Sequence, residues 1–429
     1  MAARSNGTIG MTKRKANMSP TIAAKRKRSS SPRRETVEER LGIVQRKFYP
    51  AEMSIERAHA YRDGRLEKPI DTFKKAMRET TEERDKISTG NAVVHWFKCD
   101  LRTRDNTALH MASERAIRDS VPLICIYLIS PQDFEAHLTS AVRVDFILRS
   151  LRVLQADLAQ LNIPLYVESV QRRKNLPGRL IQLCKTWNAS HLFTNVEYEV
   201  DELRREASLF RECLGSGVSF NACEDTCVVA PYTLSSLSGS QYSIYSPWYR
   251  AWLRYLNERP NHIQGYPQPA TNSPSVRQRF EDLFEVEIPE APANRRLSEQ
   301  EKQKFVNMWP AGEGEAHERL KKFIGSKIRS YKDNRNLPAG NNTSVLSVHL
   351  AAGTLAARTC IREAQHANNT SKEIGYRYGK LDAGNAGIIT WIAELAWRDF
   401  YKYDRDIHLL QMFAADFSRH IMCHAPWVV

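Results

Sequence analysis

The stretch AVVHWF at residues 92–97 starts the alternation of strands and helices that decides the fold of this chain. A second apolar run, VPLICIYLI, occupies residues 121–129, and residues 107–119 between the two have the pattern of a helix. Apolar runs with few polar interruptions are typical of strands buried on both faces of a parallel sheet. We therefore expect two buried parallel strands joined by a helix.

The same alternation continues as far as residue 222. Val144, Ile147, Leu148, Leu151, Leu154 and Leu158 recur at helical spacing and predict a helix over about 141–161. Further strands are expected at 164–167, 191–194 and 218–222, and further helices at 176–187 and 200–213. This order predicts an α/β fold with a doubly wound, Rossmann-like parallel sheet, which binds ligands beyond the carboxyl ends of its strands. No Gly-x-Gly-x-x-Gly turn follows the first strand, so an ordinary dinucleotide-binding domain is disfavoured.

The chain of 429 residues is long enough for two or three domains. We expect a basic disordered tail and linker over 1–90, the α/β domain over 91–225, a connector rich in Pro and Ser over 226–311, and an all-α domain over 312–429.

The net charge of +14 is concentrated in the tail. Ten Lys and Arg residues lie in residues 1–34, which contain no Asp or Glu, so the rest of the chain carries only +4. The cluster KRKR at 25–28 suggests nuclear import, although a solvated tail or a mitochondrial presequence would also be basic. Mean hydropathy is −0.51, and no apolar run is long enough to predict a membrane-spanning segment.

Eight cysteines are scattered without a disulfide pattern, which is typical of a reducing compartment. Cys223 and Cys227 form the only close pair, and no second pair or histidine follows at metal-ligand spacing. We interpret them as buried thiols and predict no metal site.

Two polar clusters follow predicted strands. The stretch WFKCDLRTRDNTAL at 96–109 could bind a polar ligand, but capping of the next helix by Asp105 or Asn106 is the better interpretation of this cluster alone. The stretch NVEYEVDE at 195–202 places acidic residues at a helix start, which the helix dipole by itself explains. Their expected position at one edge of the sheet is the indication of function.

Two further clusters lie in the helical region. The stretches YKDNRNLP at 331–338 and NTSVLS at 342–347 offer hydroxyls and open amides before a helix, either as an anion site or as a capped turn. In WIAELAWRDFY at 391–401, helical spacing puts Trp391, Glu394, Trp397, Arg398 and Tyr401 on one face. On this face, an aromatic ring could stack on a nucleic-acid base while the carboxylate of Glu394 accepts a hydrogen bond from it. The same face also suits an ordinary amphipathic helix in which Glu394 and Arg398 form a surface pair.

These four clusters, in this order, resemble the DNA photolyase/cryptochrome family, most closely its fungal-type class I cyclobutane pyrimidine dimer photolyases. The stretches DTCVV at 225–229 and YSPWYRAW at 245–252 also resemble the family's connector. The resemblance extends from about residue 41 to about residue 403. Each motif alone is weak evidence, whereas all of them at the family's spacing are highly specific.

The resemblance implies a role for each matching position. FAD contacts are implied for Tyr331, Thr343, Ser344, Val345, Leu346, Ser347, Trp391 and Arg398. Arg335 matches a position that binds DNA phosphate, Glu394 one that hydrogen-bonds the dimer, and Trp397 one that stacks on it. Asp201 and Glu202 match positions that bind an antenna chromophore, which is usually 5,10-methenyltetrahydrofolate and in some members a deazaflavin.

The implied activity is that of a lyase: light-driven splitting of pyrimidine dimers in UV-damaged DNA by electron transfer from reduced FAD. We expect a monomeric nuclear protein, or one shared with mitochondria. The alternatives are a cryptochrome-type blue-light photoreceptor, a photolyase for (6-4) photoproducts, and a truncated, non-catalytic chromophore-binding protein.

The chain departs from the family in three places. Lys98 stands where the family usually has Arg, and Tyr232 stands where it has Gly. Family members continue for more than a hundred residues beyond the last matching helix, and the electron-transfer tryptophans are expected in that part. Residues 404–419 look unlike the family, while 420–427 resemble its continuation, so we expect an insertion followed by premature termination. For this truncated chain we expect no catalytic residue and weak flavin retention.

Overall fold

A computed structural model describes residues 59–404 except for 62, 237–240, 338–339 and 369–380. All the described residues belong to one of the two compact units into which the chain divides. The basic cluster at 25–28 and the C-terminal segments at 405–419 and 420–427 lie outside the described residues.

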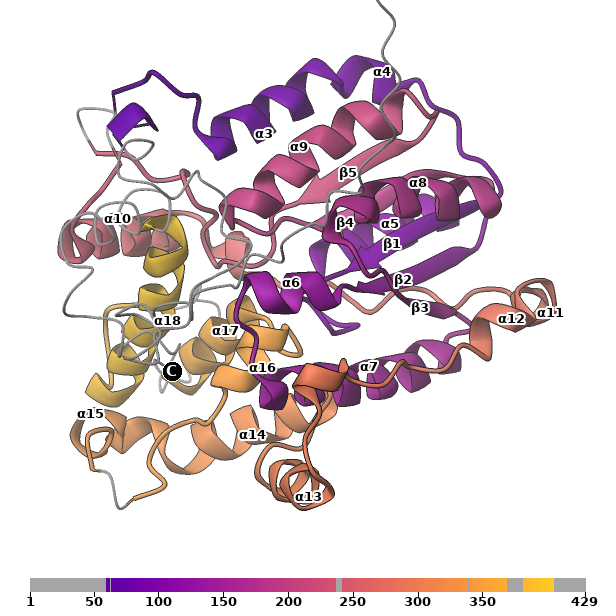
Figure 1. Cartoon of the computed structure of the whole chain (residues 1–429). Helices are drawn as coiled ribbons and strands as arrows, with labels where there is room; N and C mark the ends of the chain where they lie inside the picture. The colour runs from indigo at the N-terminus through magenta and orange to yellow at the C-terminus, as the bar shows by residue number, and fades with distance from the viewer. Residues whose placement is uncertain (1–58, 62, 237–240, 338–339, 369–380, 405–429) are drawn as a thin grey trace, which may run out of the picture. The chain divides into compact units, whose positions relative to one another are not determined.

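A parallel sheet of five strands confirms the predicted α/β class (Figure 1). The strands are β1 (Ala92–Phe97), β2 (Leu123–Ile129), β3 (Leu165–Ser169), β4 (Ala189–Asn195) and β5 (Ser219–Cys223). Their order in the sheet is β3-β2-β1-β4-β5, so the chain winds outward from β1 in both directions. The carboxyl ends of β1 and β4 therefore border the point where the winding direction switches, which is the usual ligand position in such sheets.

Helices cover both faces because successive strand residues point to opposite sides. The connecting helices are α5 (Thr107–Arg118), α7 (Ala141–Gln160), α8 (Leu176–Thr186) and α9 (Val200–Leu214). In β1, Val94 and Trp96 join the cluster formed with α8 and α9, whereas Val93 and Phe97 join the cluster formed with α5 and α7. Both faces of the sheet are therefore buried, which explains the nearly continuous apolar strands.

The expectation of a disordered tail and linker is wrong for residues 69–85. Helix α3 (Pro69–Glu79) lies along α9 and is followed by α4 (Thr81–Asp85) (Figure 1). Phe73 packs edge-on against Phe210 of α9, with ring centroids 5.5 Å apart. Three apolar residues of α3 enter the core, namely Ile70, Phe73 and Ala76. Pro69 is also buried and Met77 packs against the same core, so the apolar residues of α3 follow the spacing of an amphipathic helix and the sequence itself contains a signal for it.

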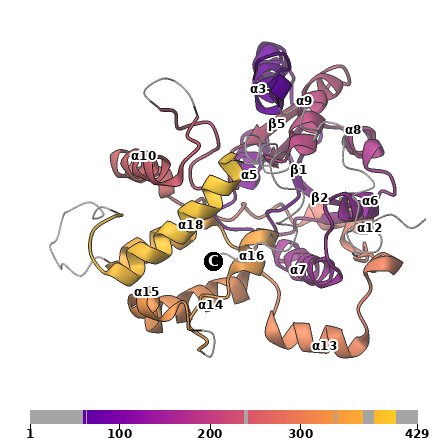
Figure 2. The ribbon, with the colours of Figure 1, turned by 60° about the vertical axis from the view of Figure 1, so that its left-hand side comes forward.

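The helical part begins earlier than expected, because the predicted connector contributes a core helix. Helix α10 (Tyr245–Glu258) packs beside α18 (Ala386–Asp404), as Figure 2 shows. The other helices are α14 (Glu313–Ser326), η5 (Ile328–Ser330), α15 (Tyr331–Asn334), α16 (Ser347–Ala352) and α17 (Ala357–Asn368). Trp248 and Trp252 of α10 share one apolar core with Trp391 of α18. None of the described helices is both long and apolar enough to cross a membrane.

The rest of the predicted connector returns along the α/β part. It contains η3 (Pro260–Ile263), α11 (Ser275–Arg279), α12 (Glu281–Phe284), η4 (Ala293–Arg295) and α13 (Glu299–Met308). Between these short elements, Asn272 donates to the carbonyl of Leu123 (2.9 Å) and accepts from its amide (3.0 Å). The side chain thereby satisfies backbone groups at the start of β2, so this stretch is bound to the sheet.

A buried cluster of charges joins the carboxyl edge of the sheet to the helical part. Arg358 of α17 contacts Asp105, which follows β1 (3.0 Å), and Asp225, which follows β5 (2.7 Å). Arg102 also pairs with Asp225, and it donates to the carbonyl of Gly353 at 3.1 Å. Burial opposes ionisation of Asp225, but the two guanidinium groups outweigh it and hold the pKa of this carboxyl below its ordinary value. The cluster is thus a fully charged, dry junction.

Removing one cation from this junction is expected to destabilise the fold. Arg358→Ala leaves Asp105 and Asp225 buried with too few partners, and we expect a loss of about 3–5 kcal/mol in the free energy of unfolding. Urea denaturation measures it. Arg211→Ala is the matched control, because Arg211 forms an exposed pair with Glu79 and should contribute about 0–1 kcal/mol. Equal losses in the two variants would contradict the account.

Candidate functional site

Three of the residues assigned to FAD by resemblance, Tyr331, Leu346 and Trp391, lie in the helical core. The ring of Phe323 packs against both Tyr331 (centroids 5.7 Å apart) and Trp391 (5.1 Å). Leu346 and Leu350 are buried in the same cluster. Tyr331 and Trp391 thus both pack on one ring, and Leu346 of the 343–347 loop belongs to the same apolar core, although the three are far apart in the sequence.

The loop Thr343–Ser347 turns into α16 with two unsatisfied polar groups nearby. Val345 has φ +53°, which places it in the left-handed region, and no side chain caps α16. The hydroxyl of Ser344 and the indole Nε1 of Trp391 are buried and have no hydrogen-bond partner among the described residues. A buried donor without a partner costs about 1–3 kcal/mol, so these atoms fit a ligand with polar acceptors such as FAD. Thr343 is exposed, and Ser347 is half-buried.

Arg398 has a different environment. Its guanidinium donates to the carbonyls of Thr226 (2.7 Å) and Leu350 (3.5 Å), and it lies 3.6 Å from Asp399. It therefore ties α18 to α16 and to the chain after β5. The interpretation that pairs Arg398 with Glu394 on the surface of α18 is wrong, because Glu394 contacts a residue from another element.

That residue is Arg335, which ends α15 and forms an ion pair with Glu394. One turn further along α18, Trp397 stacks face to face on Tyr245, with centroids 3.4 Å apart and planes within 8°. The hydroxyl of Tyr245 donates to the carbonyl of Ala393 (2.9 Å), which fixes this ring against α18. All three positions assigned to DNA by resemblance are thus neighbours on one face.

Tyr245 is the site residue that sequence reasoning missed. It begins α10, and Tyr249 stacks on it from the next turn with centroids 5.3 Å apart. Two tyrosines at i and i+4 share a helix face, so their spacing was a usable signal once the segment was assigned to a helix.

At the edge of the sheet, Asp201 and Glu202 begin α9 and lie within a network of charges. Arg173, in η2 (Arg173–Asn175), contacts Asp201 (2.5 Å) and Glu202 (3.3 Å). His137, which follows α6 (Pro131–Ala136), contacts Glu202 at 3.0 Å.

The polar cluster after β1 has a structural role in part. Asn106 caps α5, and the side chain of Asn195 donates to the carboxylate of Asp100 at 2.6 Å.

The two carboxyls of this pair differ in protonation. Burial raises the pKa of Glu202 to about 8. Burial also opposes ionisation of Asp201, but its hydrogen bond with Glu202 and the charges of His137 and Arg173 lower its pKa. One carboxylate and one carboxylic acid side by side can accept from, and donate to, a polar ligand with amide groups.

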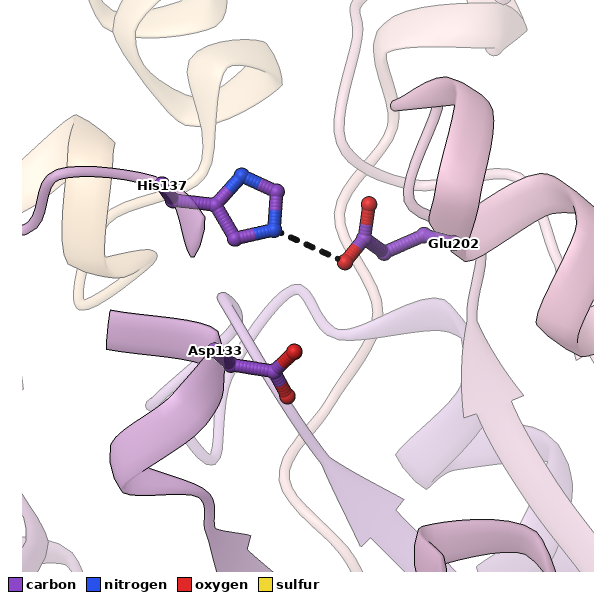
Figure 3. Close-up of side chains that lie close together, drawn as sticks. All are labelled: Asp133, His137 and Glu202. Carbon is purple, nitrogen blue, oxygen red and sulfur yellow. Dashed lines mark hydrogen bonds and ion pairs between the residues drawn. The ribbon is translucent and has the colours of Figure 1, made fainter. Parts of the chain in front are cut away.

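Asp133, His137 and Glu202 also have the composition of a metal site (Figure 3). Their ligand atoms lie within 4.8 Å of one another. Arg173, however, contacts both carboxyl groups, Asp133 at 2.6 Å and Glu202 at 3.3 Å, and Arg205 lies 3.8 Å from each. Guanidinium groups thus already occupy the space beside the carboxyl groups that a cation would need.

The two departures from the family pattern are accommodated in different ways. Lys98 pairs with the buried Glu206, and its ammonium lies 4.9 Å from the centre of the Trp96 ring. Tyr232 has φ +68°, a conformation that favours glycine, so the bulky residue is held in a strained backbone position.

Asp399, next to Arg398, generates a prediction about pH. Burial raises its pKa to about 6, although Val229 N (3.0 Å) and Trp252 Nε1 (3.3 Å) donate to it. Between pH 4 and 6 the folded state holds a proton that the unfolded state has released, so stability falls as pH rises through this interval. Relative to Asp399→Asn, the wild type should lose about 2 kcal/mol from pH 4 to pH 6.5 in urea denaturation. Parallel pH profiles of the two proteins would contradict this.

Comparisons with known proteins agree with this arrangement. Residues 93–270 match the family model described as DNA photolyase. A deoxyribodipyrimidine photo-lyase of Neurospora crassa is 48% identical over 391 residues, which cover 90% of this chain and 60% of the relative. A mitochondrial deoxyribodipyrimidine photo-lyase of Saccharomyces cerevisiae is 26% identical over 407 residues, with 90% and 66% covered. The chain thus spans between 60% and 66% of the length of these relatives.

Solved structures share the fold. A bacterial class III photolyase from Agrobacterium tumefaciens superposes with a TM-score of 0.57 at 21% identity, covering 75% of this chain and 60% of that one. A Synechocystis cryptochrome gives 0.57 at 20% identity, covering 75% and 62%. Over residues 93–270 the chain matches the DNA photolyase family, and it is similar to photo-lyases over the part of these relatives that it spans.

Proposed function

We propose that the protein to which this sequence belongs repairs cyclobutane pyrimidine dimers in UV-damaged DNA, driven by light and with FAD as cofactor. The observation that carries the proposal is the shared face of Glu394 and Trp397 on α18, with Arg335 beside it. A ring, a carboxylate and a guanidinium at one place suit a flipped-out base and its phosphate. The 48% identical photo-lyase of Neurospora crassa supports the same activity.

Each of these side chains has a distinct part in the proposal. The indole of Trp397 stacks on Tyr245 and, at a centroid distance of 5.4 Å, on the exposed Tyr401; we propose that a pyrimidine stacks on it in place of Tyr401. The carboxylate of Glu394, whose side chain is only 12% exposed, accepts a hydrogen bond from an N–H group of the base. Arg335 is more exposed, at 35%, and binds the phosphate backbone. Photolyases are a known class of base-flipping enzymes, and a poorly stacked lesion is extruded more easily than a normal base.

When bound, reduced FAD would supply the electron that splits the cyclobutane ring and would take it back afterwards, with no net redox change. We assign its binding to Tyr331, the loop Thr343–Ser347, Trp391 and Arg398. The unpartnered Ser344 hydroxyl and Trp391 indole would donate hydrogen bonds to it. The buried Tyr331, Leu346 and Trp391 would keep water from it.

We also propose that Asp201 and Glu202 bind an antenna chromophore, either 5,10-methenyltetrahydrofolate or a deazaflavin. Both molecules carry amide-like groups that the carboxylate and carboxylic acid can recognise. His137 and Arg173 would hold the two acidic side chains in place. The protein would act as a monomer, and the cluster KRKR at 25–28 would deliver it to the nucleus.

The proposed activity is tested with the complete protein to which this sequence belongs, loaded with FAD, and an oligonucleotide that contains one thymine dimer. We expect light-dependent loss of the dimer and none in the dark. In Trp397→Ala, loss of one stacking plane should weaken binding of this DNA by about 1–3 kcal/mol. Fluorescence anisotropy measures the Kd, and chromatography counts the remaining dimers.

Trp309→Ala is the matched control, because Trp309 stacks on Phe305 of α13 and belongs to no proposed site. It should change neither readout. If the FAD-loaded complete protein binds the dimer no better than undamaged DNA and leaves it intact in the light, the proposed function is wrong.

The assignment of FAD to the Ser344 loop has its own test. Ser344→Ala removes a buried hydroxyl without a partner, so the protein without FAD should become no less stable. The affinity for FAD should fall by roughly fivefold, because one hydrogen bond contributes about 1 kcal/mol. Flavin absorbance after equilibrium dialysis measures it.

Ser150→Ala is the comparison, since Ser150 of α7 also has a buried, unpartnered hydroxyl but lies in the α/β part. Its FAD retention should equal that of the wild type. Equal retention in Ser344→Ala would contradict the assignment.

A further inference from the structure

The ion pair between Arg335 and Glu394 joins two groups that the proposed function uses separately. Arg335 ends α15, and Glu394 lies in the middle of α18, 59 residues later. Among the described residues, no second carboxylate pairs with Arg335 and no second cation pairs with Glu394. Each is therefore the other's only charged partner in this part of the chain.

The two partners differ in access to solvent. The side chain of Arg335 is 35% exposed, whereas that of Glu394 is 12% exposed. Tyr331, one helical turn before Arg335, is buried next to them. Burial raises the pKa of this phenol, the charge of Glu394 adds to the effect, and Arg335 opposes it. The guanidinium thus has an outward side, while the carboxylate faces the interior.

This geometry makes the removal of Arg335 costly. A DNA phosphate can compete for the outward guanidinium, because Arg binds phosphate as well as carboxylate. The Glu394 carboxylate would then be left nearly buried without a cation, which is strongly unfavourable. The Glu394 carboxylate then needs a new hydrogen-bond donor that reaches the same buried position.

We propose that Arg335 and Glu394 form an exchange pair that couples phosphate binding to base binding. In the free protein they hold each other. When DNA binds, Arg335 moves to a phosphate only if an N–H group of an extruded pyrimidine replaces it on Glu394. Undamaged DNA provides the phosphate but does not readily provide an extruded base. Its binding is therefore weakened by the free-energy cost of leaving the Glu394 carboxylate buried without a partner. This inference rests on the proposed function and adds a physical reason why the protein would prefer dimer-containing DNA to undamaged DNA.

The decisive variant is Glu394→Gln, which keeps the size of the side chain and removes its charge. With no carboxylate to strand, Arg335 is free for phosphate in every DNA. Binding of an undamaged oligonucleotide should tighten by roughly tenfold, the effect of releasing one charge-assisted bond. The slope of log K against log[salt] should steepen by about 0.7–0.9, corresponding to one more phosphate contact.

The preference for dimer-containing over undamaged DNA should fall in the same variant. Glu299→Gln is the control, because it changes the net charge equally in an exposed pair with Lys302 on α13. It should leave the salt slope and the preference unchanged. Arg335→Gln is a second variant, in which the salt slope for dimer-containing DNA should be shallower by about one contact.

The outcomes separate the two claims. A wild-type chain that binds both DNAs equally contradicts the proposed function. A wild type that prefers dimer-containing DNA, with Glu394→Gln indistinguishable from Glu299→Gln on undamaged DNA, contradicts the exchange alone. An Arg335→Gln variant with the wild-type salt slope on dimer-containing DNA also contradicts it.

Discussion

The buried contact of Arg102 and Arg358 with Asp105 and Asp225 is the interaction on which the arrangement of the two parts depends. The guanidinium groups are 4% and 7% exposed, and they bring together the segments after β1 and β5 with helix α17. A buried carboxylate tolerates few geometries, because any loss of its partner leaves an uncompensated charge. The cluster therefore selects one position of α17 at the carboxyl edge of the sheet.

The position of the candidate site depends on this buried cluster of charges. Gly353, between α16 and α17, has φ +71°, and a Cβ atom there would lie 2.1 Å from the carbonyl oxygen of Cys99. Only glycine permits this approach of the helical part to the end of β1. Arg398 then binds α18 to the carbonyls of Thr226 and Leu350. The helix that carries Glu394 and Trp397 is thus held against both the sheet edge and α16.

The sheet and its helices could be predicted because the spacing of apolar residues within each strand and helix indicates which of its faces is buried. Helix α3 has an equally local amphipathic pattern, and what the sequence does not show is that its Phe73 packs on Phe210 of α9. The resemblance supplied Arg335, Glu394 and Trp397 as candidates with separate roles. That Arg335 pairs with Glu394, and that Tyr245 stacks on Trp397, follows from contacts across 59 and more than 140 residues. Local periodicity carries no information about such contacts.

The most direct test of the central claim is a crystal structure of the chain with a short oligonucleotide that contains one thymine dimer. The account predicts the dimer on the ring of Trp397, an N–H group of the base within hydrogen-bond distance of Glu394, and a phosphate on Arg335. A dimer bound on another surface, with the ion pair between Arg335 and Glu394 intact, would contradict it.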